Sequence, residues 1–379
     1  MPHHFTSEEL RAWLRLSLEP GLAPAQARQL LAALGLPQQI YQSSAAALAR
    51  HVPADLAAQL AQDAPDELRD AIAQAMAWLE HPRHHVLTLA DPAYPHGLLD
   101  LHDPPLLLYA NGEPSILRHP GLAVVGARSA TQSGQETARD FAGALAAQGW
   151  CIVSGLAAGI DQAAHQGALQ AGPQGAGTVA VMGTGMDLVY PSAHRDLAHR
   201  IAEHGLLLSE LPLGTRALPH HFPRRNRLVA ALAKGVLVVE AARQSGSLIT
   251  ARLAGELGRE VFAIPGSIHS PLSRGCHALI RQGAKLVESA QDILDELGAA
   301  APGQPGLPVC AAQVAAHASS VPEELRPILE RIDFAPLSPE QLLRRTGLLA
   351  TELPAVLAEL ELAGCIEALP DGRFQRLKP

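Results

Sequence analysis

Residues 236–264 read VLVVEAARQSGSLITARLAGELGREVFAI, in which two short apolar runs flank a glycine-containing loop and a stretch with helical spacing. The same order recurs from about residue 120 to residue 297, where the apolar runs are LAVV, CIVS, TVAVM, LLLS, VLVVE, VFAI and KLVE. Continuous apolar runs that alternate with helices indicate a parallel sheet covered by helices on both faces. We therefore expect an α/β fold with a Rossmann-like, doubly wound, mostly parallel sheet.

Ligands bind to such sheets beyond the carboxyl ends of the strands, so the loops that follow the apolar runs form the candidate site. Three of these loops combine small residues with the start of a helix, namely Ser154-Gly155, Gly183-Thr184 and Ser245-Gly246-Ser247. Backbone N–H groups at the amino terminus of a helix bind phosphate. One such position suits a nucleotide, whereas several in a row suit a nucleic-acid strand.

The segment HHFPRRNRLVAALAKG, which begins at residue 220, concentrates positive charge beside a helix that we expect over residues 224–233. The arginines near the amino terminus of that helix are Arg224, Arg225 and Arg227. The helix dipole disfavours cations at this end, so the arginines destabilise the helix unless an anion pairs with them. Arg128 lies on the same edge and Phe222 adds an aromatic ring, a combination typical of sequence-tolerant single-strand binding. The alternative interpretation is a solvated run of charge.

Carboxylates also follow the expected strands, at Asp161, Asp187, Glu210 and Glu240. We expect Asp161 to lie in the first turn of a helix and the others to brace loops, with metal-assisted catalysis as the alternative. The 18 histidines of the chain share no helical face, no GxxxxGK[ST] segment is present, and Leu188 replaces a glycine of the dinucleotide-binding fingerprint. We therefore expect neither a metal site nor a cofactor.

The length of 379 residues suggests two or three domains. The expected units are a helical SAM-like or helix-hairpin-helix-like domain over residues 1–80, a Rossmann-like domain over 81–297 with a lead-in segment over 81–119, a linker over 298–320, and a winged-helix domain over 321–379. Ala23 stands where a helix-hairpin-helix would have its second glycine, and the methyl group obstructs a phosphate contact. We therefore expect the first domain to be structural.

The expected winged-helix domain consists of three helices and a hairpin around Pro370-Asp371-Gly372. Its third helix carries Glu352, Glu359 and Glu361 and no lysine or arginine. Carboxylates repel DNA phosphates, so we expect this domain to contact protein or to be structural rather than to read a major groove.

The composition excludes several other classes of protein. No apolar run approaches the roughly 20 residues that a membrane-spanning helix requires, and the polar start MPHHFTSEEL does not fit a signal peptide. The four cysteines form no CxxC pair, which indicates buried thiols rather than disulfides or zinc. We expect a cytoplasmic protein without a membrane partner. Its net charge of −8 leaves nucleic-acid binding open, because binding depends on where the positive charge lies.

The motifs VVGARSAT, SGLAAGIDQAAHQGAL, GTGMDLVYPSAHRDLA, FPRRNRLVA, VVEAARQSGSLITARLAGELGREVFAIPG and GCHALIRQGA occur in this order over roughly half of the chain. In this combination the chain resembles the DNA-processing protein A (DprA/Smf) family. The resemblance implies a non-catalytic protein of natural transformation that binds and protects incoming single-stranded DNA and helps to load the RecA recombinase. It also implies a homodimer formed through the Rossmann-like domain.

The same resemblance implies the residues of the DNA site. They are Arg128 of the first loop, Phe222, Arg225, Asn226 and Arg227, which match the pattern FPxRNR, and Gly246, Ser247 and Thr250 of the SGSLITA segment. Arg224 is added to the expected site on the charge pattern alone, because it occupies the unspecified position of FPxRNR. The chain departs from the family pattern at His194 and His277, where many relatives have asparagine.

Two other classes of function are alternatives. A nucleotide-processing hydrolase of the lysine-decarboxylase-like Rossmann type carries PGGxGTxxE, with a catalytic glutamate, but here SGSLITAR is followed by no acid until Glu256. A transcription regulator would use the winged helix, whose third helix is acidic. Both alternatives are weaker than single-strand binding.

Overall fold

The computed structural model describes residues 6–298, 325–332, 334–369 and 371–377, and the expected linker falls almost entirely outside this part of the chain. Its central domain is built on a sheet with the strand order β1-β2-β6-β5-β4-β3-β7-β8-β9. The strands are β1 (His84–Thr88), β2 (Leu107–Gly112), β3 (Gly121–Val125), β4 (Cys151–Ser154), β5 (Thr178–Val181), β6 (Leu206–Ser209), β7 (Ala233–Val238), β8 (Glu260–Ala263) and β9 (Lys285–Leu286). Every apolar run that the sequence indicated is therefore a strand.

The sheet is parallel from β6 to β9, and the lead-in segment extends it with antiparallel strands. Strand β2 pairs antiparallel with β6, and β1 pairs antiparallel with β2 at the outer edge. The sequence analysis did not predict these two strands, but the sheet is mostly parallel as expected.

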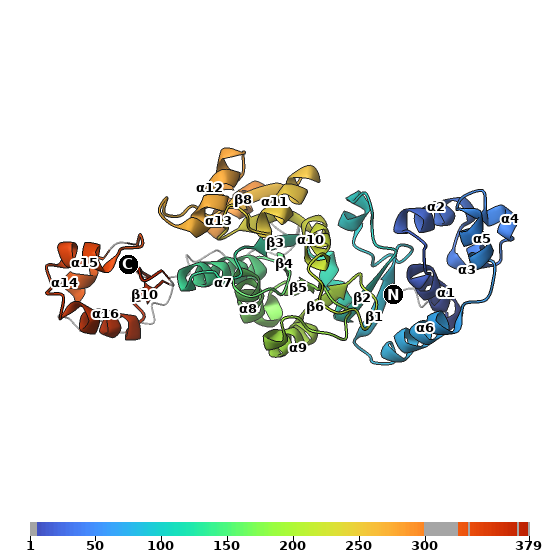
Figure 1. Ribbon diagram of the computed structural model, residues 1–379, viewed down its shortest axis with the longest axis horizontal. Helices are drawn as coiled ribbons and strands as arrows, with labels where there is room; N and C mark the ends of the chain where they lie inside the picture. Colours follow the sequence, from blue (N-terminus) through green and yellow to red (C-terminus); the bar gives the residue numbers. More distant parts are fainter. Residues whose placement is uncertain (1–5, 299–324, 333, 370, 378–379) are drawn as a thin grey trace.

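Helices cover both faces of the sheet (Figure 1). One face carries α10 (His221–Leu232), α11 (Ser247–Glu256) and α12 (Arg274–Arg281), and the other carries α7 (Gln132–Ala147), α8 (Ile160–Gln170) and α9 (Arg195–His204), with α13 (Ala290–Leu297) against α7. Adjacent residues of β3 are buried in different cores: Val124 belongs to the same core as Phe141 of α7, and Val125 belongs to the same core as Leu228 of α10. This two-sided burial confirms the doubly wound fold and explains the uninterrupted apolar runs.

The first domain is helical, as expected. Its helices are α1 (Ser7–Leu18), α2 (Pro24–Leu34), α3 (Pro37–Tyr41), α4 (Ala45–Leu48), α5 (Ala54–Leu60) and α6 (Asp66–Trp78). They bury Trp13, Leu30 and Leu60, and this core continues into the sheet through Tyr109 of β2. The indole of Trp78 stacks on His84 of β1 at 4.0 Å, which joins the helical domain to the edge of the sheet.

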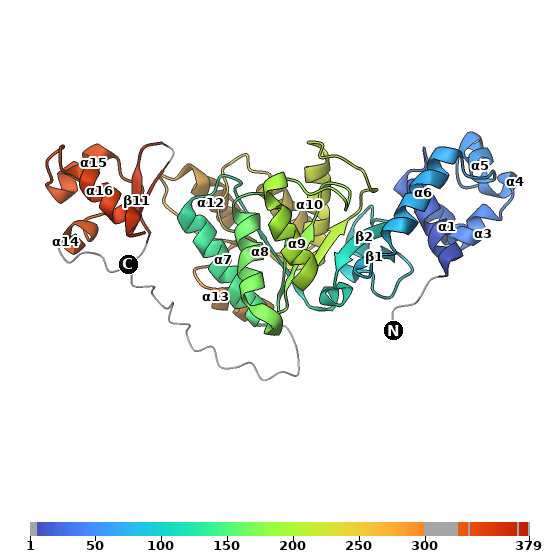
Figure 2. The same ribbon diagram turned by 90° about the horizontal axis from the view of Figure 1, so that it is seen from below.

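The last domain has the expected order of three helices and a hairpin and lies at the opposite end of the molecule from the first (Figure 2). The elements are α14 (Arg326–Leu329), α15 (Pro339–Thr346), α16 (Leu353–Leu362), β10 (Ile366–Ala368) and β11 (Phe374–Arg376). Leu342, Leu357 and Ile366 share its core, so the helices and the hairpin pack as one unit.

One expected boundary is wrong. Helix α10 begins at His221, three residues before the expected start, and strand β7 already begins at Ala233. Pro223 is thus the third helical residue, where its missing N–H is tolerated because first-turn N–H groups have no partner within the helix. Among the described residues, no helix is long and apolar enough to cross a bilayer.

Candidate nucleic-acid interface

The carboxyl ends of the parallel strands define one edge of the sheet, and the loops named in the sequence analysis gather there. Successive strands run from β3 towards β6 on one side and from β7 towards β9 on the other, so the connections diverge between β3 and β7. Such a switch point is the usual ligand position of an open α/β sheet. The loops after β3 and β7 are joined there, because the N–H of Ala127 donates to the carbonyl of Glu240 at 2.7 Å.

Arg128, Phe222 and Tyr190 form a basic and aromatic cluster at this edge. Arg128 is exposed, and its guanidinium carbon lies 5.6 Å from the centroid of the Phe222 ring. The ring rests on Gly183, where a Cβ would lie 2.9 Å from a ring carbon, so only glycine allows this packing. Tyr190, which is 52% exposed, lies with its ring centroid 5.5 Å from that of Phe222. Tyr190 was missed from the sequence, although it lies in the loop GTGMDLVYP.

Arg225 points into the protein rather than towards a ligand. Its side chain is buried, and one guanidinium nitrogen donates to the carbonyls of Gly155, after β4, and Val181, at the end of β5. Burial lowers the pKa of Arg225 to about 10, and the nearby Asp161 carboxylate opposes this shift. One of the donors on which the expected phosphate contact depends is thus engaged by the loop after β4 and the end of β5.

Asp161 braces the same region. It lies in the first turn of α8, as expected, and its carboxylate accepts from the N–H groups of Gly155 at 3.1 Å and Ala157 at 3.3 Å. Burial raises the pKa of Asp161, while the Arg225 guanidinium and the backbone donors lower it. A carboxylate with these partners holds the loop after β4 in place.

Glu210 supplies the anion for the other arginines of the segment. Arg227 is buried and pairs with Glu210 and with Asp103. Arg224 is 48% exposed, and its Nε lies 3.3 Å from Glu210 Oε1. The expectation that an anion compensates the arginines holds, but a residue of the protein provides that anion. Arg224 is the arginine of this segment that stays open to solvent.

The remaining expected site residues line the joint between α10 and α11. Asn226 donates from Nδ2 to the carbonyl of Gly246 at 3.4 Å. Gly246 is exposed and an added Cβ there would meet no atom within 4 Å, whereas Ser247 and Thr250 are buried. The structure thus brings all the expected residues to one edge, but only some of them reach its surface.

Two further exposed arginines lie near this edge, and the sequence analysis did not select them. Arg243 follows β7, and Arg274 begins α12. The N–H of Gly275 donates to the carbonyl of Ala241 at 2.7 Å, which brings the start of α12 to the loop after β7. Arg243 could have been selected from the sequence, because it lies in the loop EAARQSGSLITA, which follows an apolar run.

The other carboxylates that follow strands are also loop braces, as expected. Asp187 accepts from the N–H of Gly214 at 2.8 Å, and Glu240 accepts from both the N–H and the hydroxyl of Thr131. Burial raises the pKa of Glu240, while its hydrogen bonds with Thr131 lower it. Within the described part of the chain, no group of three or more histidine, cysteine, aspartate or glutamate residues could hold a metal ion.

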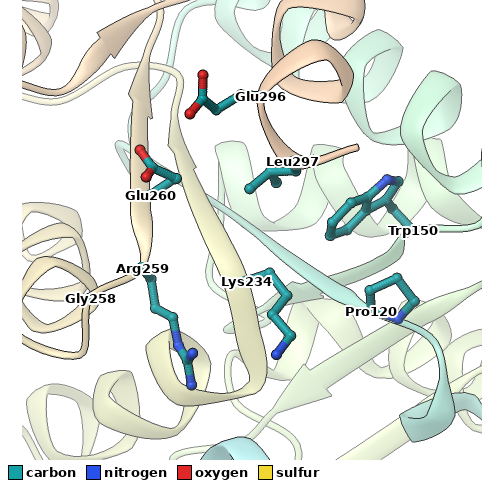
Figure 3. Close-up of a pocket in the computed structure, with 8 residues that line it drawn as sticks. All are labelled: Pro120, Trp150, Lys234, Gly258, Arg259, Glu260, Glu296 and Leu297. Carbon is teal, nitrogen blue, oxygen red and sulfur yellow. The ribbon is translucent and has the colours of Figure 1, made fainter. Parts of the chain in front are cut away.

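A cavity of about 480 Å³ lies at the opposite edge, by the amino ends of β3, β7 and β8. Figure 3 shows Glu260 and Glu296 on one side of it, Lys234 and Arg259 on another, and the Trp150 ring beside Leu297. It is separated from the candidate interface by the length of the strands.

The fold and the edge define a class, namely a Rossmann-like protein with a basic and aromatic ligand edge between a helical domain and a winged-helix domain. The chain belongs to the DNA-processing protein A (DprA/Smf) family. The family model for DNA recombination-mediator protein A matches residues 85–298, and the model for the DprA winged helix domain matches residues 312–372. The resemblance seen in the sequence motifs is thus confirmed.

Similar proteins extend this match to most of the chain. Protein Smf of Escherichia coli K12 is 41% identical over 314 residues, which is 82% of each chain. DNA processing protein DprA of Streptococcus pneumoniae R6 is 48% identical over 209 residues, covering 55% of this chain and 73% of the relative.

Two solved structures share the fold. The X-ray structure of DprA from Streptococcus pneumoniae has a TM-score of 0.62 and 38% identity, covering 77% of this chain and 98% of that chain. A structure of DNA processing protein A from Helicobacter pylori, described for its single-stranded DNA binding mode, has a TM-score of 0.52 and 31% identity and covers 57% and 96% of the two chains.

Proposed function

We propose that this protein binds single-stranded DNA along the carboxyl edge of its sheet, protects it, and helps to load RecA on it during natural transformation and recombination. The observation that carries the proposal is the cluster of Arg128, Phe222 and Tyr190, in which an exposed guanidinium lies beside the Phe222 ring and the Tyr190 ring lies next to that of Phe222. Guanidinium groups bind phosphates and aromatic rings stack on bases, so the cluster offers both contacts that sequence-tolerant strand binding needs. The single-strand binding described for the Helicobacter pylori relative supports the same function.

The expected DNA-contacting residues then take two kinds of role. Arg128 and Arg224 contact phosphates, because both are exposed, and Phe222 contributes its ring. Asn226, Gly246, Ser247 and Thr250 form the part of the path at the start of α11. Arg225 and Arg227 are positioning residues, since they hold the loops after β4, β5 and β6 through buried contacts.

A titration with one labelled oligonucleotide, first single-stranded and then annealed to its complement, tests the proposed function. We expect fluorescence anisotropy to show tight binding of the single strand and much weaker binding of the duplex, because bases in a duplex are not free to stack on the protein. Equal affinity for both forms would contradict the proposal.

The proposed partners are RecA and a second copy of this chain. We infer the dimer to form through the Rossmann-like domain, and sedimentation equilibrium measures its mass directly. For RecA, we measure the lag before RecA hydrolyses ATP on a strand that is already coated with a single-strand-binding protein. We expect this protein to shorten that lag. An unchanged lag would contradict the loading role while leaving DNA binding intact.

We infer that the protein acts by binding rather than by covalent chemistry. Asp161 and Glu240 hold loops, and Glu256, the first acid after SGSLITAR, pairs with Arg252 at 3.1 Å on the exposed side of α11. The carboxylates Asp161, Asp187 and Glu210 of this edge are likewise engaged by donors of the protein. A hydrolase of the related Rossmann type instead needs a carboxylate that is free to act on its substrate. Incubation with ATP, AMP or labelled DNA and magnesium tests this, and turnover that disappears in Glu240→Gln would overturn it.

A further inference from the structure

The amino terminus of α7 carries two N–H groups that turn away from its own domain. Thr131 precedes the helix, and its hydroxyl accepts from the N–H of Gly134 at 2.9 Å. Glu240 in turn accepts from the N–H of Thr131 at 2.9 Å. The first two N–H groups of the helix, those of Gln132 and Ser133, take part in neither contact.

A carboxylate of the winged-helix domain accepts from both of these groups. Glu367, in strand β10, accepts from the N–H of Gln132 at 2.8 Å and lies 3.5 Å from the N–H of Ser133. More than 200 residues separate the partners, so this is a contact between domains. Figure 1 shows the winged-helix domain beyond the end of α7. An anion from elsewhere in the chain therefore occupies the helix terminus.

The occupied position lies on the DNA edge of the sheet. Arg128 is exposed in the same loop, four residues before Gln132. Backbone N–H groups at a helix terminus bind phosphate oxygens as they bind a carboxylate, and the helix dipole favours both. A strand that places one phosphate on Arg128 can place a neighbouring phosphate on α7.

The carboxylate of Glu240 opposes the contact of Glu367 with the start of α7. Burial is the main cause of the raised pKa of Glu240, and the charge of Glu367 adds to it, so the two carboxylates repel each other across the start of α7. A phosphate at this position meets the same repulsion, but the neighbouring Arg128 compensates it by binding the same strand.

We propose that the N–H groups of Gln132 and Ser133 are a phosphate-binding position of the DNA path, and that Glu367 occupies this position in the DNA-free protein. The winged-helix domain thereby competes with the strand for the start of α7, and DNA displaces it. This inference rests on the proposed single-strand binding.

The first test removes the competing charge in the full chain. Glu367→Ala is compared with Glu361→Ala, which removes the charge of an exposed acid on α16 of the same domain. Because a helix-terminal charge contact is modest, we expect Glu367→Ala to bind a labelled single strand about three- to tenfold more tightly than Glu361→Ala at low salt. Equal affinity of the two variants would overturn the inference. If the wild-type protein binds no single strand at all, it is the proposed function that fails.

The second test removes a single N–H group in the Glu367→Ala background. Gln132→Pro is compared with Gln132→Ala, since both lose the side chain and only proline lacks the N–H. Proline suits the first position of a helix, and Thr131, with φ −65° and ψ 161°, has the extended conformation that a residue before proline adopts. We expect the proline variant to bind the single strand several-fold more weakly than the alanine variant, with a matching melting temperature. Equal binding would show that no phosphate contacts this N–H.

Discussion

The side chains of Arg227 and Glu210 form an ion pair that is buried on both sides, with 10% and 8% of the side-chain surfaces exposed. Arg227 comes from α10 and Glu210 directly follows β6, so the pair ties a helix to the end of a strand. Asp103, from the segment before β2, adds its backbone carbonyl at 2.9 Å from Arg227. A charge in this position is structural, because its partners leave little room for a ligand.

Breaking this pair is expected to destabilise the fold. Glu210→Gln removes the anion that pairs with the buried Arg227 guanidinium, and Arg227→Ala removes the cation that pairs with the buried Glu210 carboxylate. Each substitution leaves a buried charge without this partner, which lowers the unfolding free energy by about 3–5 kcal/mol. Arg224→Ala removes the exposed partner of the same carboxylate and should cost less than about 1 kcal/mol. Urea denaturation measures all three variants. Similar losses for Arg224 and Arg227 would contradict the buried role of Arg227.

Arg128 is expected to contribute a phosphate contact. It follows the carboxyl end of β3, whereas the exposed Arg118 precedes the amino end of the same strand, so Arg118→Ala is a matched control. Arg128→Ala should weaken binding on all sequences and flatten the dependence of log K on log salt by about 0.7 for one lost single-strand contact. Anisotropy titrations over a range of salt concentrations give both quantities. The prediction fails if Arg118→Ala and Arg128→Ala change the slope equally.

Phe222 is expected to act through its ring rather than through charge. Phe222→Leu keeps apolar volume against Gly183 but removes the aromatic face, and it should lower affinity by about 1–3 kcal/mol if one base stacks there. No counterion is released by stacking, so the salt dependence should match that of the wild-type protein. A changed slope with unchanged affinity in low salt would indicate that the ring serves only to orient Arg128.

His165 is expected to make stability depend on pH. It is fully buried between α8 and the sheet, with Nδ1 at 2.7 Å from the hydroxyl of Thr178, the first residue of β5, and that hydroxyl donates to the carbonyl of Ile152. Nδ1 is therefore the protonated nitrogen of a neutral ring. Burial, assisted by the charge of Arg225, lowers the pKa of His165 to about 3.

In the unfolded chain, His165 has an ordinary pKa of about 6.5 and binds a proton below that pH. The folded protein does not bind this proton until the pH approaches about 3, so the unfolding free energy falls as the pH is lowered from about 6.5 towards about 3. His165→Asn lacks this proton uptake. The stability difference between wild type and His165→Asn should therefore shrink between about pH 7 and about pH 5 in urea denaturation. Parallel pH profiles of the two proteins would rule out a neutral buried His165.

The expected sheet agrees with the structure because its signal is local. Each strand of the doubly wound part is buried on both faces, so an apolar run such as LAVV has no polar alternation and is readable without its neighbours. Asp161 was placed in a first helical turn for a similar reason, since SGLAAGID puts it directly after a glycine loop. Strands β1 and β2 were missed because they join the sheet through long-range antiparallel pairing.

Sequence alone therefore determined the family, the doubly wound part of the sheet, the edge that carries the loops and most of the residues named there, because motif order and apolar patterning are properties of short segments. Only the tertiary structure decided which charges are free. Arg225 and Arg227 are buried because their face of α10 packs on the protein, where their guanidinium groups meet acceptors that lie far away in the chain, at Val181 and Glu210. The contact of Glu367 with Gln132 likewise depends on the tertiary structure, because the two residues lie far apart in the chain. A guanidinium or a carboxylate has the same chemistry wherever it stands, and its role depends on whether folding brings it a partner or leaves it to solvent.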